Sequence, residues 1–388
     1  MRIAFNGLTL REPPSGTRQY AYHLLRALGR VDGVNDYLVL SPGEPRDVPE
    51  TPDTFAWQSE PVGRLSRGGE SVEKLVWGQY TFPAAARRGK ARLLHVPHFG
   101  PPMVTYGIPC IVTIHDVIGL RLSSYRASPA IAAYGGLITR AARAAALILT
   151  VSEFSKRDIM EALGIPADRI RVVPEAAPPG FRRVVDAQRL RETRARYGLG
   201  ERFVLYVGGL DQRKNVASLV GAFAAVYHEI GDPDLKLLIG GDPERLGSGP
   251  LFPDWRPLAA TFGVADQVLC APIPEEDLAP LYSATSCFVF PSLYEGFGLP
   301  PLEAMACGAP VVCSERTSLP EVVGSAGILI NPEDPDALGA AIQRVLSSRD
   351  LRDDLRARAL ARARQFSWDQ VAVETSAIYA EVAGTRLT

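Results

Sequence analysis

The sequence predicts an α/β protein built from two successive doubly wound parallel sheets. Three observations support this fold class. The chain has 388 residues, enough for two to three domains that each bury a core. Short apolar runs alternate with helix-like segments, which is typical of parallel sheets covered by helices on both faces. The alternation pauses at the proline-rich stretch Pro174 to Gly180 and then restarts.

The first series of elements lies before that pause. We expect strands at residues 3–5, 37–40, 93–96, 110–114, 147–151 and 170–173. We expect helices at residues 17–28, 72–86, 129–145 and 153–163. Ser152 directly precedes the last of these helices and is a suitable N-cap.

The second series follows a charged segment, residues 182–197, that we interpret as a linker into a new domain. Its expected strands are residues 203–207, 235–239, 267–271, 287–290 and 310–313. Its expected helices are residues 216–230, 254–262, 275–284, 302–307, 335–346, 350–364 and 368–382. Two sheets of this kind would each bind ligands at the carboxyl ends of their strands.

Composition excludes several classes of protein. The net charge is −1, which excludes a globally basic nucleic-acid-binding protein. The five cysteines form no Cys-x-x-Cys pair, so we expect reduced, buried thiols. No apolar run approaches the ~20 residues that span a bilayer. We therefore expect a cytoplasmic protein, either fully soluble or peripheral at the inner face of the membrane.

The most informative segment is residues 290–308, where a strand ends in a glycine-containing loop that leads into a helix. Glu295 lies in the loop, and we expect Glu303 in the first turn of the helix. Such a loop and helix start can hold an anion, and the two carboxylates can accept sugar or ribose hydroxyls. The alternative is that Glu303 only complements the helix dipole and that Glu295 is a solvated turn residue.

This segment resembles the E-x7-E signature of retaining glycosyltransferases with the GT-B fold, specifically glycosyltransferase family four. The resemblance covers nearly the whole chain and includes residues 203–215, 274–282, 318–321 and 366–368. It implies two Rossmann-like domains that face a central cleft. The implied domains are residues 1–178, which would bind the acceptor, and residues 179–366, which would bind the nucleotide-sugar donor. It also implies a final helix, residues 367–388, that crosses back onto the first domain.

A second constellation, residues 208–215, follows a strand and precedes a helix. Arg213 and Lys214 are suited to binding phosphate there, although a solvated helix start is the alternative. The resemblance implies that an Arg and a Lys clamp the donor diphosphate. Lys214 matches the family's Lys, whereas the family's Arg often stands where this chain has Gly209. We expect Arg213 to take over part of that role.

The resemblance also assigns the remaining donor contacts. Glu303 would hold the ribose hydroxyls. Glu295 would hold the donor sugar together with the loop that follows it, formed by Gly296, Phe297 and Gly298.

The expected strand at residues 110–114 delivers His115 and Asp116 to its carboxyl end. A packed structural histidine is one interpretation, and the resemblance favours a His that binds a donor-sugar hydroxyl. Asp116 would either orient His115 or, as we favour, cap the following turn. The N-terminal loop contributes Gly16 as a candidate donor contact, with helix capping by Ser15 as the alternative.

Two further patterns are weaker. Asp232-Pro-Asp234 and Asp334-Pro-Asp336 match the metal-binding D-x-D of another glycosyltransferase fold, but we expect turns or a helix start there. The arginine-rich residues 344–364 predict a solvated helix face, with contact to an anionic membrane as the alternative.

Taken together, the sequence predicts a metal-independent retaining glycosyltransferase with no bound cofactor. It would move a hexose, with mannose and glucose as candidates, from a nucleotide-diphosphate sugar to a saccharide, lipid-linked or small-molecule acceptor. The candidate catalytic residues are His115, Glu295 and Lys214. The alternatives are a nucleotide-sugar epimerase on the same fold and a non-catalytic nucleotide-sugar-binding protein. No nucleic-acid partner is expected.

Overall fold

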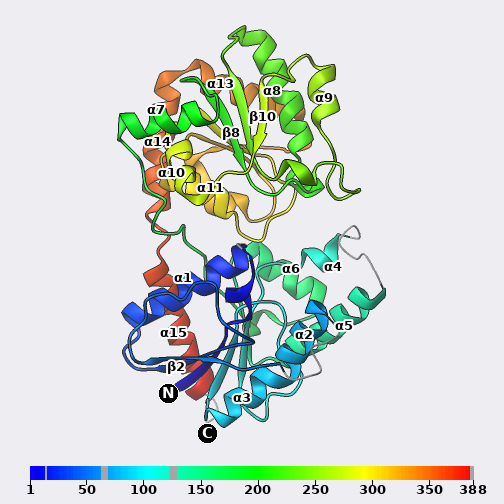
Figure 1. Ribbon diagram of the computed structural model, residues 1–388, viewed down its shortest axis with the longest axis vertical. Helices are drawn as coiled ribbons and strands as arrows, with labels where there is room; N and C mark the ends of the chain where they lie inside the picture. Colours follow the sequence, from blue (N-terminus) through cyan, green and yellow to red (C-terminus); the bar gives the residue numbers. More distant parts are fainter. Residues whose placement is uncertain (14, 63–68, 123–128, 385–388) are drawn as a thin grey trace. The chain divides into compact units, whose positions relative to one another are not determined.

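The computed structural model describes residues 1–13, 15–62, 69–122 and 129–384. The chain divides into two compact units (Figure 1). Unit 1 comprises Met1–Glu175 and Ser367–Thr388, and unit 2 comprises Ala176–Phe366. Each unit contains one parallel sheet covered by helices, which confirms the predicted fold class. Among the described residues, no helix combines the length and the apolar character that crossing a bilayer requires.

Unit 1 is built on a seven-stranded sheet of order β3-β2-β1-β4-β5-β6-β7, in which all neighbouring strands are parallel. The strands are β1 (Arg2–Asn6), β2 (Asp36–Ser41), β3 (Phe55–Ser59), β4 (Leu93–Val96), β5 (Cys110–Thr113), β6 (Leu147–Thr150) and β7 (Ile170–Val172). The central strands are buried on both faces, which explains their continuous apolar runs. The apolar pattern did not predict the edge strand β3, because only Phe55 in it is buried.

The helices of unit 1 cover both faces of that sheet. They are η1 (Leu8–Arg11), α1 (Gly16–Val31), α2 (Glu70–Val76), η3 (Trp77–Thr81), α3 (Phe82–Arg88), α4 (Ile118–Arg121), α5 (Pro129–Ala144), α6 (Glu153–Leu163), η5 (Ala167–Arg169) and α15 (Trp368–Gly384). The Ser152 hydroxyl accepts a hydrogen bond from the Ser155 amide at 3.0 Å, which confirms the predicted N-cap of α6. The expected helix 72–86 instead contains a π-helical segment, η3, between α2 and α3.

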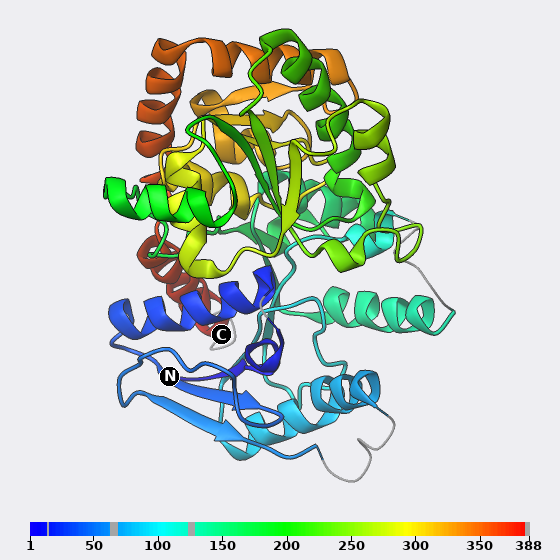
Figure 2. The same ribbon diagram turned by 45° about the horizontal axis from the view of Figure 1, so that its top comes forward.

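The last helix, α15, lies beside α1 although the two are separated by almost the whole sequence (Figures 1 and 2). The Ser376 hydroxyl donates to Asp32 Oδ2 at 2.7 Å. The Tyr379 hydroxyl lies 2.5 Å from His95 Nδ1, and both side chains are fully buried. The chain therefore completes unit 1 only after it has passed through unit 2.

Unit 2 is built on a six-stranded parallel sheet of order β10-β9-β8-β11-β12-β13. The strands are β8 (Phe203–Val207), β9 (Lys236–Gly240), β10 (Val268–Ala271), β11 (Cys287–Phe290), β12 (Val311–Ser314) and β13 (Ile328–Ile330). From β8 the strand order grows outward in one direction, and from β11 it grows in the other. The adjacent carboxyl ends of β8 and β11 thus form a topological switch point, where such sheets bind ligands.

The helices of unit 2 surround this sheet. They are α7 (Ala187–Arg196), η6 (Gln212–Lys214), α8 (Val216–Ile230), η7 (Pro243–Arg245), α9 (Arg256–Thr261), α10 (Glu275–Ala284), α11 (Leu299–Ala306), α12 (Leu319–Val323), η8 (Gly324–Ala326), α13 (Pro335–Ser347) and α14 (Arg349–Ala363). The interpretation of residues 182–197 as a linker was wrong, because α7 lies within them. This helix buries only Thr193 and therefore lacks the apolar stripe that would have revealed it.

Candidate active site

The candidate site in unit 2 lies at the switch point between β8 and β11. The segment after β8 contains Gly208, Gly209 and the short helix η6, which carries Arg213 and Lys214. The loop after β11 carries Glu295. The two segments are joined by backbone contacts, since the Leu293 amide donates to the Arg213 carbonyl at 2.7 Å. Residues 81 positions apart are thereby brought into direct contact.

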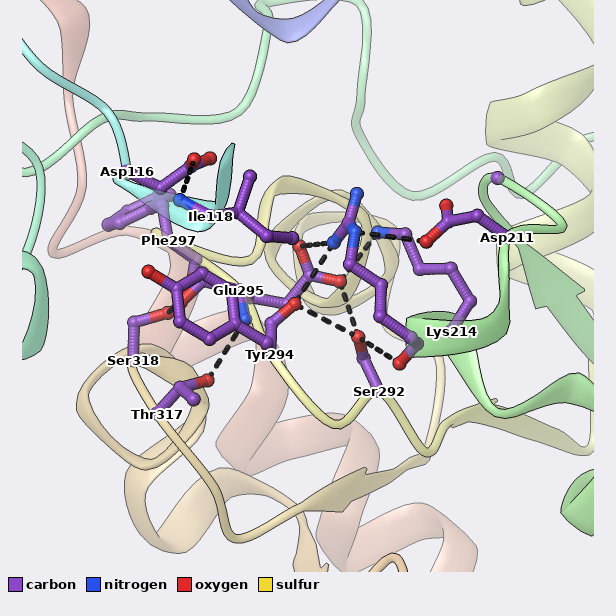
Figure 3. Close-up of polar contacts among 12 residues, drawn as sticks. Asp116, Ile118, Asp211, Lys214, Ser292, Tyr294, Glu295, Phe297, Thr317 and Ser318 are labelled. Atoms are coloured by element: carbon purple, nitrogen blue, oxygen red, sulfur yellow. Dashed lines mark hydrogen bonds and ion pairs between the residues drawn. The ribbon is translucent and has the colours of Figure 1, made fainter. Parts of the chain in front are cut away.

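A buried ionic cluster forms where these segments meet (Figure 3). Lys214 Nζ lies 2.5 Å from Glu295 Oε1, and Arg213 Nη1 lies 3.0 Å from Glu295 Oε2. The Ser292 hydroxyl donates to Glu295 Oε1 at 2.7 Å. Arg213 Nε lies 3.1 Å from Asp211 Oδ1. Two cations and two carboxylates are therefore packed together, and their formal charges cancel.

Burial and the close ion pairs together shift the pKa values of the cluster residues. Burial lowers the pKa of Lys214, with the Glu295 carboxylate opposing that shift. Burial also raises the pKa of Glu295, but Lys214 and Arg213 outweigh it and leave that pKa below its ordinary value. Lys214 Nζ further lies 5.0 Å from the ring centroid of Phe290, within cation–π range. Glu295 is consequently ionised at neutral pH, and removing either partner would leave a buried charge uncompensated.

Gly209, where the family often carries Arg, lies directly beside the cluster. A Cβ atom there would lie 2.9 Å from Asp211 Oδ2 and 3.8 Å from Lys214 Cε. The Arg213 guanidinium reaches the same cluster from η6, four residues further along the chain. The site thus contains a second cation even though position 209 supplies none.

The loop from Glu295 to Gly298 is held by the segment that precedes α12. The Thr317 hydroxyl accepts from the Glu295 amide at 3.1 Å. The Ser318 hydroxyl lies 3.0 Å from the Glu295 carbonyl and 2.7 Å from the Phe297 carbonyl (Figure 3). Gly298 has φ +119, and a Cβ atom there would lie only 2.7 Å from a Leu319 methyl group. Glycine is therefore required at this position.

Glu303 is placed differently from the prediction. Helix α11 begins at Leu299, so Glu303 is the fifth helical residue and lies in the second turn rather than the first. The helix therefore begins three residues before the expected range 302–307. Glu303 is 6% exposed, and the Tyr282 hydroxyl donates to its Oε2 at 3.2 Å. Burial raises the pKa of Glu303 to about 7, although the Tyr282 hydrogen bond opposes the shift.

Tyr282 was not recognised as a site residue. It lies in α10 and is fully buried, so its apolar surroundings gave the pattern of an ordinary core tyrosine. A buried hydroxyl needs a hydrogen-bond partner, and the partner of the Tyr282 hydroxyl is the Glu303 carboxyl group.

The candidate site residue of unit 1, His115, follows β5. Its Nδ1 lies 2.8 Å from Glu175 Oε1, and its Nε2 lies 3.1 Å from the Pro97 carbonyl oxygen. The Tyr20 ring contacts the imidazole edge to face, with ring centroids 4.7 Å apart. Glu175 lies just beyond β7, within the proline-rich residues 174–180, whose composition indicated only the end of a domain.

Asp116 caps a turn and does not contact the imidazole through a described hydrogen bond. Its Oδ1 accepts from the Ile118 amide at 3.0 Å (Figure 3). The favoured interpretation of Asp116 as a turn residue is thereby confirmed. The imidazole instead contacts the carboxylate of Glu175 through Nδ1.

Gly16 is the first residue of α1, and Ser15 is the N-cap whose side chain accepts from the Arg18 amide at 3.2 Å. The capping alternative is confirmed for Ser15. A Cβ atom at Gly16 would meet no other atom within 4 Å, so no neighbouring atom requires a glycine at this position. Pro14, in the same predicted loop, lies outside the described residues.

The two Asp-Pro-Asp segments take the local roles predicted for them. Asp232 Oδ1 accepts from the Asp234 amide in a turn, and the Asp334 side chain caps α13 by accepting from the Ala337 amide. Within the described ranges, no group of three or more His, Cys, Asp or Glu side chains is arranged to hold a metal ion.

Four arginines of α14 bind carbonyl groups of their own unit, whereas Arg349 is exposed, as predicted for a solvated face. Arg352 donates to Leu346, Arg356 to Gly308, Arg358 to Ser325 and Arg362 to Val322. These guanidinium groups tie α14 to neighbouring elements of unit 2.

Comparison with known proteins agrees with this architecture. The family model described as Glycosyltransferase Family 4 matches residues 14–179, and the model described as Glycosyl transferases group 1 matches residues 191–362. An O-antigen chain mannosyltransferase B of Escherichia coli is 34% identical over 295 residues, which cover 76% of each chain. A serotype-specific mannosyltransferase of Escherichia coli is 33% identical, but the match covers only 27% of that longer protein.

Solved structures share the fold. A sucrose-phosphate synthase of Thermosynechococcus elongatus superposes with a TM-score of 0.76 at 23% identity and covers 99% of both chains. An Anabaena protein, crystallised in complex with UDP-glucose, superposes with a TM-score of 0.73 at 16% identity and covers 98% of this chain and 100% of its own. The chain therefore belongs to glycosyltransferase family four, the glycosyl transferases group 1, and is a glycosyltransferase.

Proposed function

We propose that this glycosyltransferase transfers a hexose from a nucleotide-diphosphate sugar to a saccharide or lipid-linked saccharide acceptor, with retention of anomeric configuration and without a metal ion. The observation that carries the proposal is the buried cluster of Lys214, Arg213 and Glu295 at the switch point of unit 2. Two cations at that edge of the sheet suit the diphosphate of a donor.

Donor binding would exchange partners within this cluster. The diphosphate replaces Glu295 as the anion beside Lys214 and Arg213, and the released Glu295 carboxylate accepts hydroxyls of the donor sugar. The exchange conserves charge compensation around the two cations, so neither is left unpaired in a buried site. It also agrees with an ionised Glu295 in the free protein, because both oxygens of a carboxylate can accept hydrogen bonds from hydroxyls.

Glu303 would bind the ribose. A carboxylate can accept two neighbouring hydroxyls at once, and the Tyr282 hydroxyl keeps the Glu303 side chain in a fixed orientation. Because burial raises the pKa of Glu303 to about 7, ribose binding favours the ionised form and would release a proton near neutral pH.

The cations would also promote bond cleavage. Charge develops on the departing phosphate as the bond to the anomeric carbon breaks, and preorganised positive groups stabilise it. Lys214 and Arg213 would supply this stabilisation in place of a divalent ion.

The relatives support a hexose as the transferred group. Several carry the name mannosyltransferase, and one of them acts on the O-antigen chain by its name. We therefore propose mannose first among the hexoses, and a growing polysaccharide as the acceptor class.

Incubation with a panel of nucleoside-diphosphate hexoses and short mannosides, followed by mass spectrometry, tests this function. A product one hexose heavier, formed by the native protein and absent with Lys214→Met, supports it. Epimerised donor without acceptor would indicate an epimerase. Donor that binds but never reacts would indicate a non-catalytic binding protein.

A further inference from the structure

The ring of His115 faces a hydrogen-bond acceptor at each nitrogen. Glu175 Oε1 lies 2.8 Å from Nδ1, and the Pro97 carbonyl oxygen lies 3.1 Å from Nε2. A backbone carbonyl can only accept, and so can an ionised carboxylate. Both ring nitrogens must then carry hydrogen for the two contacts to be hydrogen bonds.

We propose that Glu175 is a positioning residue that holds His115 as an imidazolium, which donates to Glu175 and to the Pro97 carbonyl and cannot serve as a base. An imidazolium has no lone pair with which to take the proton of an acceptor hydroxyl. This inference rests on the proposed function, because it specifies how His115 takes part in transfer.

The surroundings of the pair support the assignment. The Glu175 side chain is only 4% exposed and that of His115 18%, so solvent screens their interaction weakly. Tyr20 covers one side of the imidazole, and the Ser155 hydroxyl donates to the His115 carbonyl at 2.9 Å. Ring and backbone are therefore both fixed.

Burial and the partners of His115 shift its pKa in opposite directions. Burial lowers the pKa of His115, but the bonds to Glu175 and Pro97 raise it more, so the net pKa lies above the ordinary value. Asp116 raises the pKa of His115 further, as the smallest of these contributions. The neighbouring His95 and His98 have pKa values lowered to about 3 and about 4 by burial first, and by His115 second, so both are neutral at pH 7.

The consequence for the reaction concerns the acceptor proton. If His115 cannot take it, the proton must pass to another group, and the departing phosphate oxygen on the same face of the sugar is available for it. The Glu175–His115 pair would thereby remove His115 as a base and favour retention over inversion.

Nitrogen-15 NMR of the histidine rings in the full-length protein tests the proposal without any activity measurement. The chain has five histidines, and His115→Asn identifies the signal of His115. We expect both of its ring nitrogens to be protonated at pH 7. Glu175→Gln keeps the shape but removes the charge, and it should lower the pKa of His115 by roughly 1–3 units. Asp116→Asn is the matched control and should shift it much less.

An unprotonated nitrogen on His115 at pH 7 in the native protein would overturn the proposal, whether or not the variants fold. An equal shift in Glu175→Gln and Asp116→Asn would also overturn the role of Glu175. Because these readouts need no substrate, failure of the proposed transfer reaction leaves them interpretable. Where transfer occurs, the acidic variant Glu175→Asp should retain more activity than Glu175→Gln across the pH profile.

Discussion

Lys214 and Glu295 form a buried ion pair, with Nζ and Oε1 2.5 Å apart, in which each side chain is about 90% hidden from solvent. The pair joins the two segments that follow β8 and β11, so it forms only when both strands are correctly placed. In the proposed function the same two groups separate when the donor binds. Their mutual attraction therefore opposes donor binding.

Lys214→Met should weaken binding of nucleoside diphosphates by about ten- to a hundredfold, because a charge-assisted hydrogen bond is worth roughly 1.5–3 kcal/mol. Isothermal titration calorimetry measures the change. Lys236→Met is the matched control in the same unit, since Lys236 Nζ donates to the Asp266 carbonyl at an exposed position. Unchanged affinity in Lys214→Met would remove Lys214 from the site.

Glu295→Gln should have opposite effects on binding and on turnover. Nucleoside diphosphates should bind more tightly, because the competing carboxylate is gone from beside Lys214 and Arg213. Transfer should slow by roughly ten- to a hundredfold, the effect of one lost hydrogen bond to a charged group. Glu333→Gln, which alters an exposed pair with Arg316, should change neither. Parallel losses of affinity and turnover in Glu295→Gln would contradict the exchange of partners.

Nucleotide binding should strengthen as pH rises through about 7. Glu303 must be ionised to accept two ribose hydroxyls, and its pKa is raised to about 7 by burial, so its ionised fraction grows between pH 6 and pH 8. That change corresponds to roughly tenfold in affinity. Calorimetry in buffers of different ionisation enthalpy measures the released proton.

Two variants separate this effect from titration of the nucleotide itself. The Glu303→Gln variant should bind the nucleotide weakly. Its affinity should change with pH only as far as the nucleotide itself titrates. Tyr282→Phe removes a hydrogen bond that lowers the pKa of Glu303, so its transition should move to higher pH. A pH dependence identical in all three proteins would exclude Glu303.

Transfer should continue in the presence of EDTA, because Lys214 and Arg213 supply the positive charge that a divalent ion provides elsewhere. Initial rates with and without the chelator test this. Complete loss that magnesium or manganese restores would instead point to a metal-dependent reaction.

The product should keep the anomeric configuration of the donor, so that an α-linked nucleotide sugar gives an α-glycoside. Proton coupling at the anomeric position decides this for gluco-configured donors, and the one-bond carbon–proton coupling decides it for manno-configured donors. A β-product from an α-donor would falsify the retaining mechanism.

Apolar runs and loop motifs predicted the elements well, because a strand buried on both faces must be apolar throughout. They could not predict α7, since a helix that buries only Thr193 carries no periodic signal. The sequence predicted which segments carry the candidate site, but it did not predict which side chains pair with each other there. That Glu295 neutralises Lys214, or that Glu175 orients His115, depends on side-chain directions across 81 and 60 residues of sequence, which local patterns do not encode.

The return of α15 to unit 1 has a consequence for synthesis on the ribosome. Tyr379, which reaches His95 inside unit 1, is translated after all of unit 2. Until then the emerging first unit lacks the helix that lies beside α1, and a buried histidine lacks its hydroxyl partner. Unit 2 is continuous in sequence and can fold as it emerges, while unit 1 matures last. A released chain that ends near residue 366 should therefore have a protease-sensitive first unit and a resistant second unit.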